Sequence, residues 1–94
     1  MAVAKRNHGR VSLDGPIPLQ RLPEGRWARL VGAVPHNVSQ RLLDLGFVPG
    51  TRLKIVRRAP LGDPIEIEIR GSRMCFRRSQ LRGFRVVLEE EHRS

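Results

Sequence analysis

The chain has 94 residues and a formal net charge of +9, from 18 Lys and Arg against 9 Asp and Glu. A chain of this length supports one small hydrophobic core, which excludes a large cleft between two lobes and with it most multi-domain enzymes. All of the cations except Lys5 and Lys54 are arginines. An excess of this size raises the question of an anionic partner such as nucleic acid, a phosphate-bearing ligand or a membrane surface.

The cysteine count and the lengths of the apolar runs indicate the cellular compartment. Cys75 is the one cysteine, so no disulfide can form within the chain. No charged stretch followed by an apolar run resembles a signal peptide, and no apolar run approaches the ~20 residues that span a bilayer as a helix. We therefore expect a cytoplasmic protein that reaches a membrane only through a partner.

Composition divides the chain into three parts. Residues 1–15 carry few large apolar groups, which predicts a flexible basic arm. Residues 16–88 hold evenly spread apolar residues and predict one compact domain, and residues 89–94 form a polar tail. The arm carries +2 (three cations, one acid), the domain +9 (fourteen cations, five acids) and the tail −2 (one cation, three acids). The excess positive charge therefore belongs to the expected domain.

The first expected elements are a strand and a helix. Residues 26–31 predict a strand with Ala28 and Leu30 inward, followed by a bend at Gly32. Residues 39–45 predict the only substantial helix, which Asn37 or Ser39 can cap. Apolar residues fall on one side of that helix, a glycine ends it, and a Pro-Gly pair fits a type II turn after it: Val38, Leu42, Leu45, Gly46, Phe47, Pro49 and Gly50.

The next two strands form the clearest pattern in the sequence. Residues 65–69, Ile-Glu-Ile-Glu-Ile, alternate strictly and predict a half-buried strand. Residues 51–56 alternate in the same way, with Leu53 and Ile55 inward. The link between them, residues 57–64, contains two prolines, a glycine and an aspartate, which predicts a hairpin with a loop longer than two residues.

The last part of the domain completes a small barrel. Residues 73–77 predict a strand after a tight break at Gly71, residues 79–82 a short helical turn, and residues 84–88 a final strand. About five short strands with one short helix predict a mainly β protein, a compact and partly open β-barrel.

Catalytic residues are scarce. His8 and His92 lie in the expected flexible ends, and His36 lies in a loop with no catalytic motif around any serine. Glu66 and Glu68 lie on the outer face of a strand, where they can pair with cations across the sheet. We expect no enzymatic activity.

Metal binding has little support from residue spacing. A zinc site usually needs four nitrogen or sulfur ligands, and the chain has no pair of closely spaced cysteines or histidines that would supply them. Cys75 and His36 remain weak candidates, for Fe²⁺ or another divalent transition metal, if the fold brings them together. Further ligands would have to come from the tails or from a second chain.

Nucleic-acid binding is an alternative that the arginines favour and the aromatic residues disfavour. Small barrels often bind RNA or DNA. Here the four aromatic residues are Trp27, Phe47, Phe76 and Phe84, and three of them read as core positions, so surfaces for base stacking are scarce. The cations are also spread along the chain. A high-GC genome favours arginine codons, which would also explain the enrichment in arginine. A basic nucleic-acid-binding barrel is therefore the less favoured interpretation.

Residues 41–78 resemble the FeoA family of small proteins that accompany ferrous-iron transport. The ordered series is Arg41-Leu42, Leu45-Gly46, Pro49-Gly50-Thr51, Pro60-Leu61-Gly62-Asp63-Pro64, residues 65–70, Gly71 and an arginine-rich strand. Each motif alone is a common turn, but the order and spacing together are specific. Weaker similarity extends upstream to Ile17 and downstream to Leu88.

The resemblance implies an SH3-like barrel with an inserted helix and a cytoplasmic, non-enzymatic accessory role. The implied partner is FeoB, a large membrane iron transporter with a GTPase domain. The same fold forms the C-terminal domain of DtxR-type repressors, which leaves a divalent-metal-sensing regulatory domain as another alternative. Residues 1–15 show no winged-helix pattern, so we expect this alternative to need a separate DNA-binding chain.

The exposed hairpin between residues 57 and 64 is the predicted contact with the partner. A loop held by two prolines is already partly ordered, so binding through it costs less entropy. The predicted contact residues are Arg57, Arg58, Leu61, Gly62, Asp63 and Pro64. We also expect outward strand cations to attract an acidic protein or the negatively charged inner membrane face: Arg52, Lys54, Arg73 and Arg77.

Overall fold

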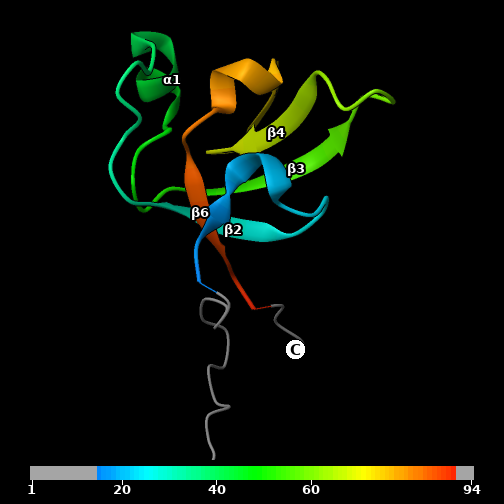
Figure 1. The fold of residues 1–94 in the computed structure, drawn as a ribbon. Coiled ribbons are helices and arrows are strands. Elements are labelled where there is room, and N and C mark those ends of the chain that lie inside the picture. The colour runs from blue at the N-terminus through cyan, green and yellow to red at the C-terminus, as the bar shows by residue number, and fades with distance from the viewer. Residues whose placement is uncertain (1–14, 91–94) are drawn as a thin grey trace, which may run out of the picture.

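The protein is mainly β, with a single antiparallel sheet that curls around a small core (Figure 1). A computed structural model describes residues 15–90. Its strands are β1 (Ile17–Pro18), β2 (Trp27–Val31), β3 (Arg52–Arg58), β4 (Ile65–Ile69), β5 (Ser72–Phe76) and β6 (Arg85–Leu88), in the spatial order β1-β6-β2-β3-β4-β5. The helical elements are α1 (Gln40–Leu45) and two short 3₁₀ helices, η2 (Leu19–Arg21) and η3 (Arg78–Leu81).

Helix α1 begins and ends where its sequence predicts. The Ser39 hydroxyl accepts the backbone N–H of Leu42 at 3.2 Å, so the cap is Ser39 and not Asn37. Gly46 adopts the left-handed conformation with φ 112°, and the N–H of Phe47 returns to the carbonyl of Leu42 at 3.0 Å. The chain therefore leaves the helix at Gly46, and the next side chain, Phe47, is already buried in the core.

The turn after the helix is also as predicted. The N–H of Thr51 donates to the carbonyl of Val48 at 3.2 Å, and Gly50, between them, has φ 94°. This combination is that of a type II turn with proline at its second position. Strand β3 begins directly after this turn, at Arg52.

Strands β3, β4 and β5 form a continuous antiparallel ribbon. Leu53 lies opposite Ile69 and Ile55 opposite Ile67, so both strands direct the same alternate residues inward. The register shifts between Ile55 and Arg57, which bends the ribbon near its loop. At its other end, Arg70 (φ 52°) and Gly71 (φ 81°) form a two-residue turn of the type that suits twisted hairpins.

The core is apolar, and the described residues place no polar or charged side chain in it. Phe47 is at its centre, with ring centroids 5.2 Å from Phe76 and 5.5 Å from Phe84, both in edge-to-face geometry. Every strand from β2 to β6 contributes to this cluster, as does α1 through Leu42. The buried set is Leu19, Leu22, Ala28, Leu30, Leu42, Phe47, Leu53, Ile55, Ile65, Ile67, Ile69, Phe76, Leu81, Phe84 and Val86.

Several boundaries differ from the sequence predictions. The sheet has six strands in the described part of the chain, since β1 joins it by pairing Ile17 with Val86. Neither β1 nor η2 was predicted, and β3 runs two residues further than residue 56. Most of the predicted arm (residues 1–14) and the last four residues of the predicted tail lie outside the described residues.

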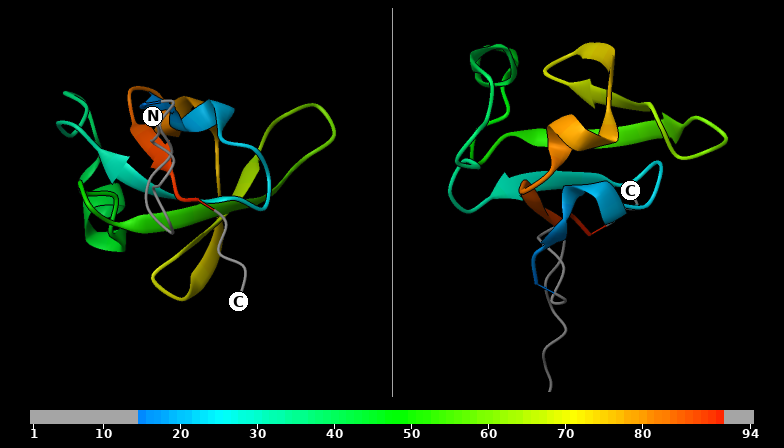
Figure 2. Two further views of the ribbon diagram at one scale, coloured as in Figure 1. Left: turned by 90° about the horizontal axis from the view of Figure 1, so that it is seen from below. Right: turned by 45° about the horizontal axis from the view of Figure 1, so that its top comes forward.

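Helix α1 and the loop between β3 and β4 lie at opposite ends of the molecule. In Figures 1 and 2, α1 lies at one end of the sheet and the loop between β3 and β4 projects from the other. The helix η3 lies between them and is held to η2 by a hydrogen bond of 2.8 Å from the Gln20 side chain to the Arg78 carbonyl. The start of β1 and the end of β6 lie together because these strands are antiparallel neighbours.

Candidate functional site

The loop between β3 and β4, residues 59–64, presents an apolar tip to solvent. Leu61 is 93% exposed, the highest value among the exposed large apolar side chains of residues 15–90; the other such residue is Val48 at 36%. The loop is closed on itself by the N–H of Gly62 bonded to the Ala59 carbonyl (2.7 Å) and the N–H of Ala59 bonded to the Pro64 carbonyl (3.0 Å). Leu61 is thus displayed on a defined turn.

Two carboxylates attach the hairpin to the body of the molecule. The Asp63 carboxylate accepts the backbone N–H of Arg78 at 2.8 Å, which ties the loop to the start of η3. The Glu24 carboxylate accepts the backbone N–H of Arg58 at 2.9 Å, which ties the end of β3 to the turn before β2. Asp63 therefore has a structural role that sequence reasoning did not foresee.

Arg57 and Arg58, the other predicted contact residues, have different surroundings. The Arg58 guanidinium donates to the carbonyls of Gln20 and Leu22 at 2.7 and 2.8 Å, so it holds η2 against β3. The Arg57 side chain is 65% exposed and lies 3.3 Å from the Glu66 carboxylate. Gly62 and Asp63 are partly buried, and Pro64 is exposed beside them.

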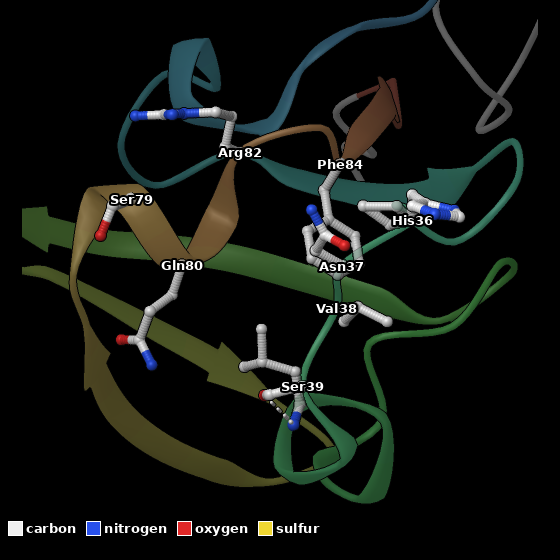
Figure 3. A pocket seen from close by; sticks show the side chains of 10 residues that line it. His36, Asn37, Val38, Ser39, Ser79, Gln80, Arg82 and Phe84 are labelled. Carbon is white, nitrogen blue, oxygen red and sulfur yellow. Dashed lines mark hydrogen bonds between the residues drawn. The ribbon is translucent and has the colours of Figure 1, made fainter.

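A first hollow of about 400 Å³ lies between the segment before α1 and η3 (Figure 3). Val38, Leu42 and Phe84 supply apolar walls, and Ser79 and Gln80 supply polar groups from η3. In Figure 3 the His36 imidazole points away from Ser79 and Gln80. The remaining lining residues are Pro35, His36, Asn37, Ser39 and Arg82.

A second hollow of about 410 Å³ lies on the other side of η3, under the β3–β4 loop. It shares Ser79 and Arg82 with the first hollow. In Figure 3 the Arg82 guanidinium extends away from Asn37 and Val38, toward the side where η2 lies. The lining residues are Gln20, Arg21, Arg58, Gly62, Asp63, Arg78, Ser79 and Arg82.

Sequence reasoning missed this second hollow. Its arginines come from η2, the end of β3 and the η3 region, which are up to 61 positions apart in the chain (21 to 82). No local pattern joins such segments. The only signal was the density of arginine near turns, and turn arginines are too common to single out.

The outward strand cations are on the surface, as predicted, but most are paired. Glu89 lies 2.9 Å from Arg52 and 3.3 Å from Arg29, and Glu68 lies 3.8 Å from Lys54 and 3.4 Å from Arg73. Of the four predicted docking cations, only Arg77 makes no ion pair within residues 15–90. The carboxylates thus offset much of the positive charge of this sheet face.

Glu89 lies just beyond the C-terminal boundary that composition predicts for the domain. Its backbone N–H donates to the carbonyl of Trp27 at 3.0 Å, and its carbonyl accepts the Arg26 side chain at 2.9 Å. The composition places Glu89 in the polar tail, whereas its contacts make it a part of the sheet.

The aromatic residues are not arranged for base stacking. Phe47, Phe76 and Phe84 are buried. Trp27 is half-buried on the outer face, where the Arg52 guanidinium and the Lys54 ammonium lie 4.2 and 4.8 Å from its ring centroid. These are cation–π contacts that cover the ring.

The two candidate metal ligands have separate surroundings. His36 is exposed in the loop before α1, and Cys75 is exposed on β5, opposite Glu66. Across residues 15–90, no group of three or more His, Cys, Asp or Glu side chains is placed to hold a metal ion. The described residues therefore do not fit a resident metal site.

No helix within residues 15–90 has both the length and the apolar character that crossing a membrane requires.

The chain was compared with known families and solved structures. A FeoA domain profile matches residues 17–86. Iron(II) transport protein A from Clostridium thermocellum is 34% identical over 77% of this chain, with a TM-score of 0.68; this chain covers 45% of that longer one. The FeoA protein of Chlorobium tepidum is 40% identical, with coverage of 77% of this chain and 70% of its own and a TM-score of 0.66.

A third structure bears on the fold. Stenotrophomonas maltophilia FeoA, complexed with zinc, is described as a prokaryotic SH3-domain protein and a candidate ferrous iron transport activating factor. It is 26% identical, covers 83% of this chain and 99% of its own, and has a TM-score of 0.59. The barrel is accordingly SH3-like, and through the match that spans nearly all of its strands the chain belongs to the FeoA domain family.

Proposed function

We propose that this protein is a non-enzymatic accessory module of ferrous iron transport. It binds the cytoplasmic part of a FeoB-type transporter that carries a GTPase domain, and it modulates iron uptake at the inner face of the membrane. Membership of the FeoA family supports the pathway. The observation that carries a docking role is the β3–β4 loop, where Leu61 is 93% exposed on a turn that hydrogen bonds close.

The exposed tip suits protein binding on energetic grounds. Burying a leucine side chain contributes roughly 1.5–3 kcal/mol, which corresponds to at least a tenfold gain in affinity. The internal bonds of the loop and its tether through Asp63 reduce the ordering that binding would otherwise require. Leu61 is therefore the residue that we place at the centre of the contact.

The test measures binding of the full chain to the purified cytoplasmic domain of the transporter from the same organism. We expect Leu61→Ala to weaken binding by roughly tenfold or more, because truncation removes most of the buried apolar area. Val48→Ala is the matched control, since Val48 is the other exposed large apolar residue and lies by α1, at the end of the molecule away from the loop. Equal binding by Leu61→Ala and the wild type would remove the loop from the interface.

The contact does not need the Asp63 carboxylate to reach the partner. That carboxylate already accepts the Arg78 N–H, so a variant at Asp63 tests loop shape and not direct contact. Leu61→Ala and Asp63→Ala should therefore be measured separately.

A further inference from the structure

The arginine side chains of the second hollow differ from those of the sheet face in making no ion pair within residues 15–90. Arg29, Arg52, Arg57 and Arg73 each lie within 3.4 Å of a glutamate oxygen. By contrast, the guanidinium groups of three arginines of the hollow make no ion pair or side-chain hydrogen bond within residues 15–90: Arg21, Arg78 and Arg82. The hollow thus brings together several arginines that have no ion pair, beside the β3–β4 loop. Within residues 15–90 the other arginines without an ion pair lie outside the hollow, at separate places on the surface: Arg41, Arg70, Arg77 and Arg85.

Asp63, the one carboxylate among the described residues that line the hollow, offsets only part of this charge. Asp63 uses its Oδ1 to accept the backbone N–H of Arg78. Counting side chains, four arginines and one aspartate give the lining a formal charge of +3. Concave walls strengthen the resulting field, because less water screens the charges there than on a flat surface.

We propose that this hollow binds the carboxylates of an acidic segment of the protein partner, next to the site where Leu61 makes its apolar contact. The inference rests on the proposed function and adds the chemistry that the partner must present: two or more Asp or Glu side chains beside an apolar residue. Gly62 and Asp63 line the hollow and directly follow Leu61, so one segment can reach both.

Three backbone N–H groups around the hollow are not available to a phosphate. Phosphate sites commonly use free backbone N–H groups at turns and helix starts. Here the N–H groups of Gly62, Arg78 and Arg82 already donate to Ala59, Asp63 and Ser79. The side-chain donors that remain are guanidinium groups and the Ser79 hydroxyl, and guanidinium groups bind carboxylates as well as phosphates through two parallel hydrogen bonds.

The lining also disfavours a nucleotide. Within residues 15–90 no aromatic or large apolar side chain lines the second hollow, so a base would find no aromatic ring to stack on. The exposed Leu61 beside it adds an apolar contact that a free inorganic anion would not use. A mixed acidic and apolar protein segment uses both features.

The experiment titrates the ¹⁵N-labelled full chain with acetylated hexaglutamate at low salt and follows amide shifts. We expect shifts around Gln20 to Leu22, Gly62 and Arg78 to Arg82, with no shifts on addition of hexaglutamine. Arg21→Gln combined with Arg82→Gln should weaken binding about tenfold, the effect of losing two charge-assisted contacts at an exposed site. Both side chains are exposed, so the variant should keep its fold, which thermal unfolding checks.

The matched control removes the same charge elsewhere. Arg41→Gln combined with Arg85→Gln also lowers the net charge by two, on α1 and β6, outside both hollows, at exposed arginines that make no ion pair within residues 15–90. We expect this variant to bind hexaglutamate within about twofold of the wild type. An equal loss in both double variants would overturn the site, because net charge alone would then explain binding. Tighter binding of inorganic pyrophosphate than of hexaglutamate would overturn the carboxylate assignment.

A second arm separates this inference from the proposed function. The same variants are titrated with the transporter's cytoplasmic domain. If the wild type does not bind that domain but binds hexaglutamate at the hollow, the transporter is the wrong partner and the carboxylate site stands. If the wild type binds the domain and Arg21→Gln with Arg82→Gln binds it equally well, the hollow is not a part of that interface and the inference fails.

Discussion

Gly46 shows how one position in this chain serves two elements. It ends α1 with φ 112°, and the Arg70 side chain from the β4–β5 turn lies directly over its Cα. A Cβ at this position would collide with the Arg70 Cδ. The absence of a side chain therefore fixes the end of the helix and also provides the surface on which Arg70 rests.

We expect Gly46→Ala to destabilise the protein more than Gly71→Ala. Both positions have positive φ, which costs an alanine about 1–2 kcal/mol. Gly71 has open space around its Cα, whereas at Gly46 the Arg70 side chain must also move and lose its packing. Chemical denaturation of the two variants measures the difference. If they lose equal stability, the contact between Gly46 and Arg70 contributes nothing.

Single residues also show where sequence reasoning reached its limit. The inward positions of β3 and β4 followed from alternation, and Ser39 was one of the two caps predicted for α1, because alternation and capping are local properties. The role of Arg58 did not, because its guanidinium binds carbonyls that are more than 30 positions earlier in the chain. A residue that acts across such a distance looks, in the sequence, like any other surface arginine.

The β3–β4 hairpin is the element on which both proposals depend. Two side-chain carboxylates hold it to the rest of the molecule: that of Glu24 accepts the backbone N–H of Arg58, and that of Asp63 accepts the backbone N–H of Arg78. Because the second tether joins the loop to η3, it also sets the shape of the hollow between them. The position of the loop relative to η3 should therefore depend on the Asp63 carboxylate.

We expect Asp63→Ala to lower stability by about 1–2 kcal/mol and to increase exchange of the Gly62 and Arg78 amide hydrogens, because the Arg78 N–H loses its acceptor. Asp63→Asn keeps an oxygen at the same position and should restore most of the protection. Hydrogen-exchange NMR on the full chain follows both amides. Unchanged exchange in Asp63→Ala would show that the loop is held by its backbone bonds alone.

The elements that sequence reasoning missed are those that tertiary pairing creates. Strand β1 has two residues, too few for an alternating pattern, and exists because Ile17 and Pro18 pair with β6. Helix η2 is three residues long and is held by the Arg58 guanidinium at its carbonyls. Residues 65–69 can be predicted as a strand from their own alternation. The short elements β1 and η2 form only through contacts with distant residues, which no local sequence pattern indicates.

At the scale of the whole molecule, the net charge of +9 is unevenly compensated. Across the outer face of the sheet, Glu66, Glu68 and Glu89 pair with cations from neighbouring strands. Among residues 15–90 the arginines of the second hollow, beside η3, have no such ion pair. The positive charge is therefore partly offset on the sheet face, is gathered in the second hollow, and is otherwise carried by single arginines elsewhere on the surface.

This distribution predicts weak binding to nucleic acids. A gel shift with duplex DNA or single-stranded RNA at ~0.15 M salt should show no complex at micromolar protein, because few phosphates would be contacted and salt screens them strongly. The described residues also offer no exposed aromatic ring to bases. A stable complex at that salt concentration would favour the basic nucleic-acid-binding barrel over the accessory role.

The sequence predicted the barrel and the loop but only half of the candidate site. Leu61 could be singled out because turn residues surround it locally. The cationic hollow next to it could not, since it exists only where η2, the loop and η3 converge. The outward cations that were predicted as a docking surface are mainly used for pairing across strands.

The pairing of β1 with β6 brings the two ends of the described chain to one side of the molecule (Figure 1). A fluorophore, an affinity tag or an additional protein domain joined at that side would lie away from the β3–β4 loop, which projects from another part of the molecule (Figure 1). The barrel can therefore be immobilised through that side in a binding measurement without covering Leu61.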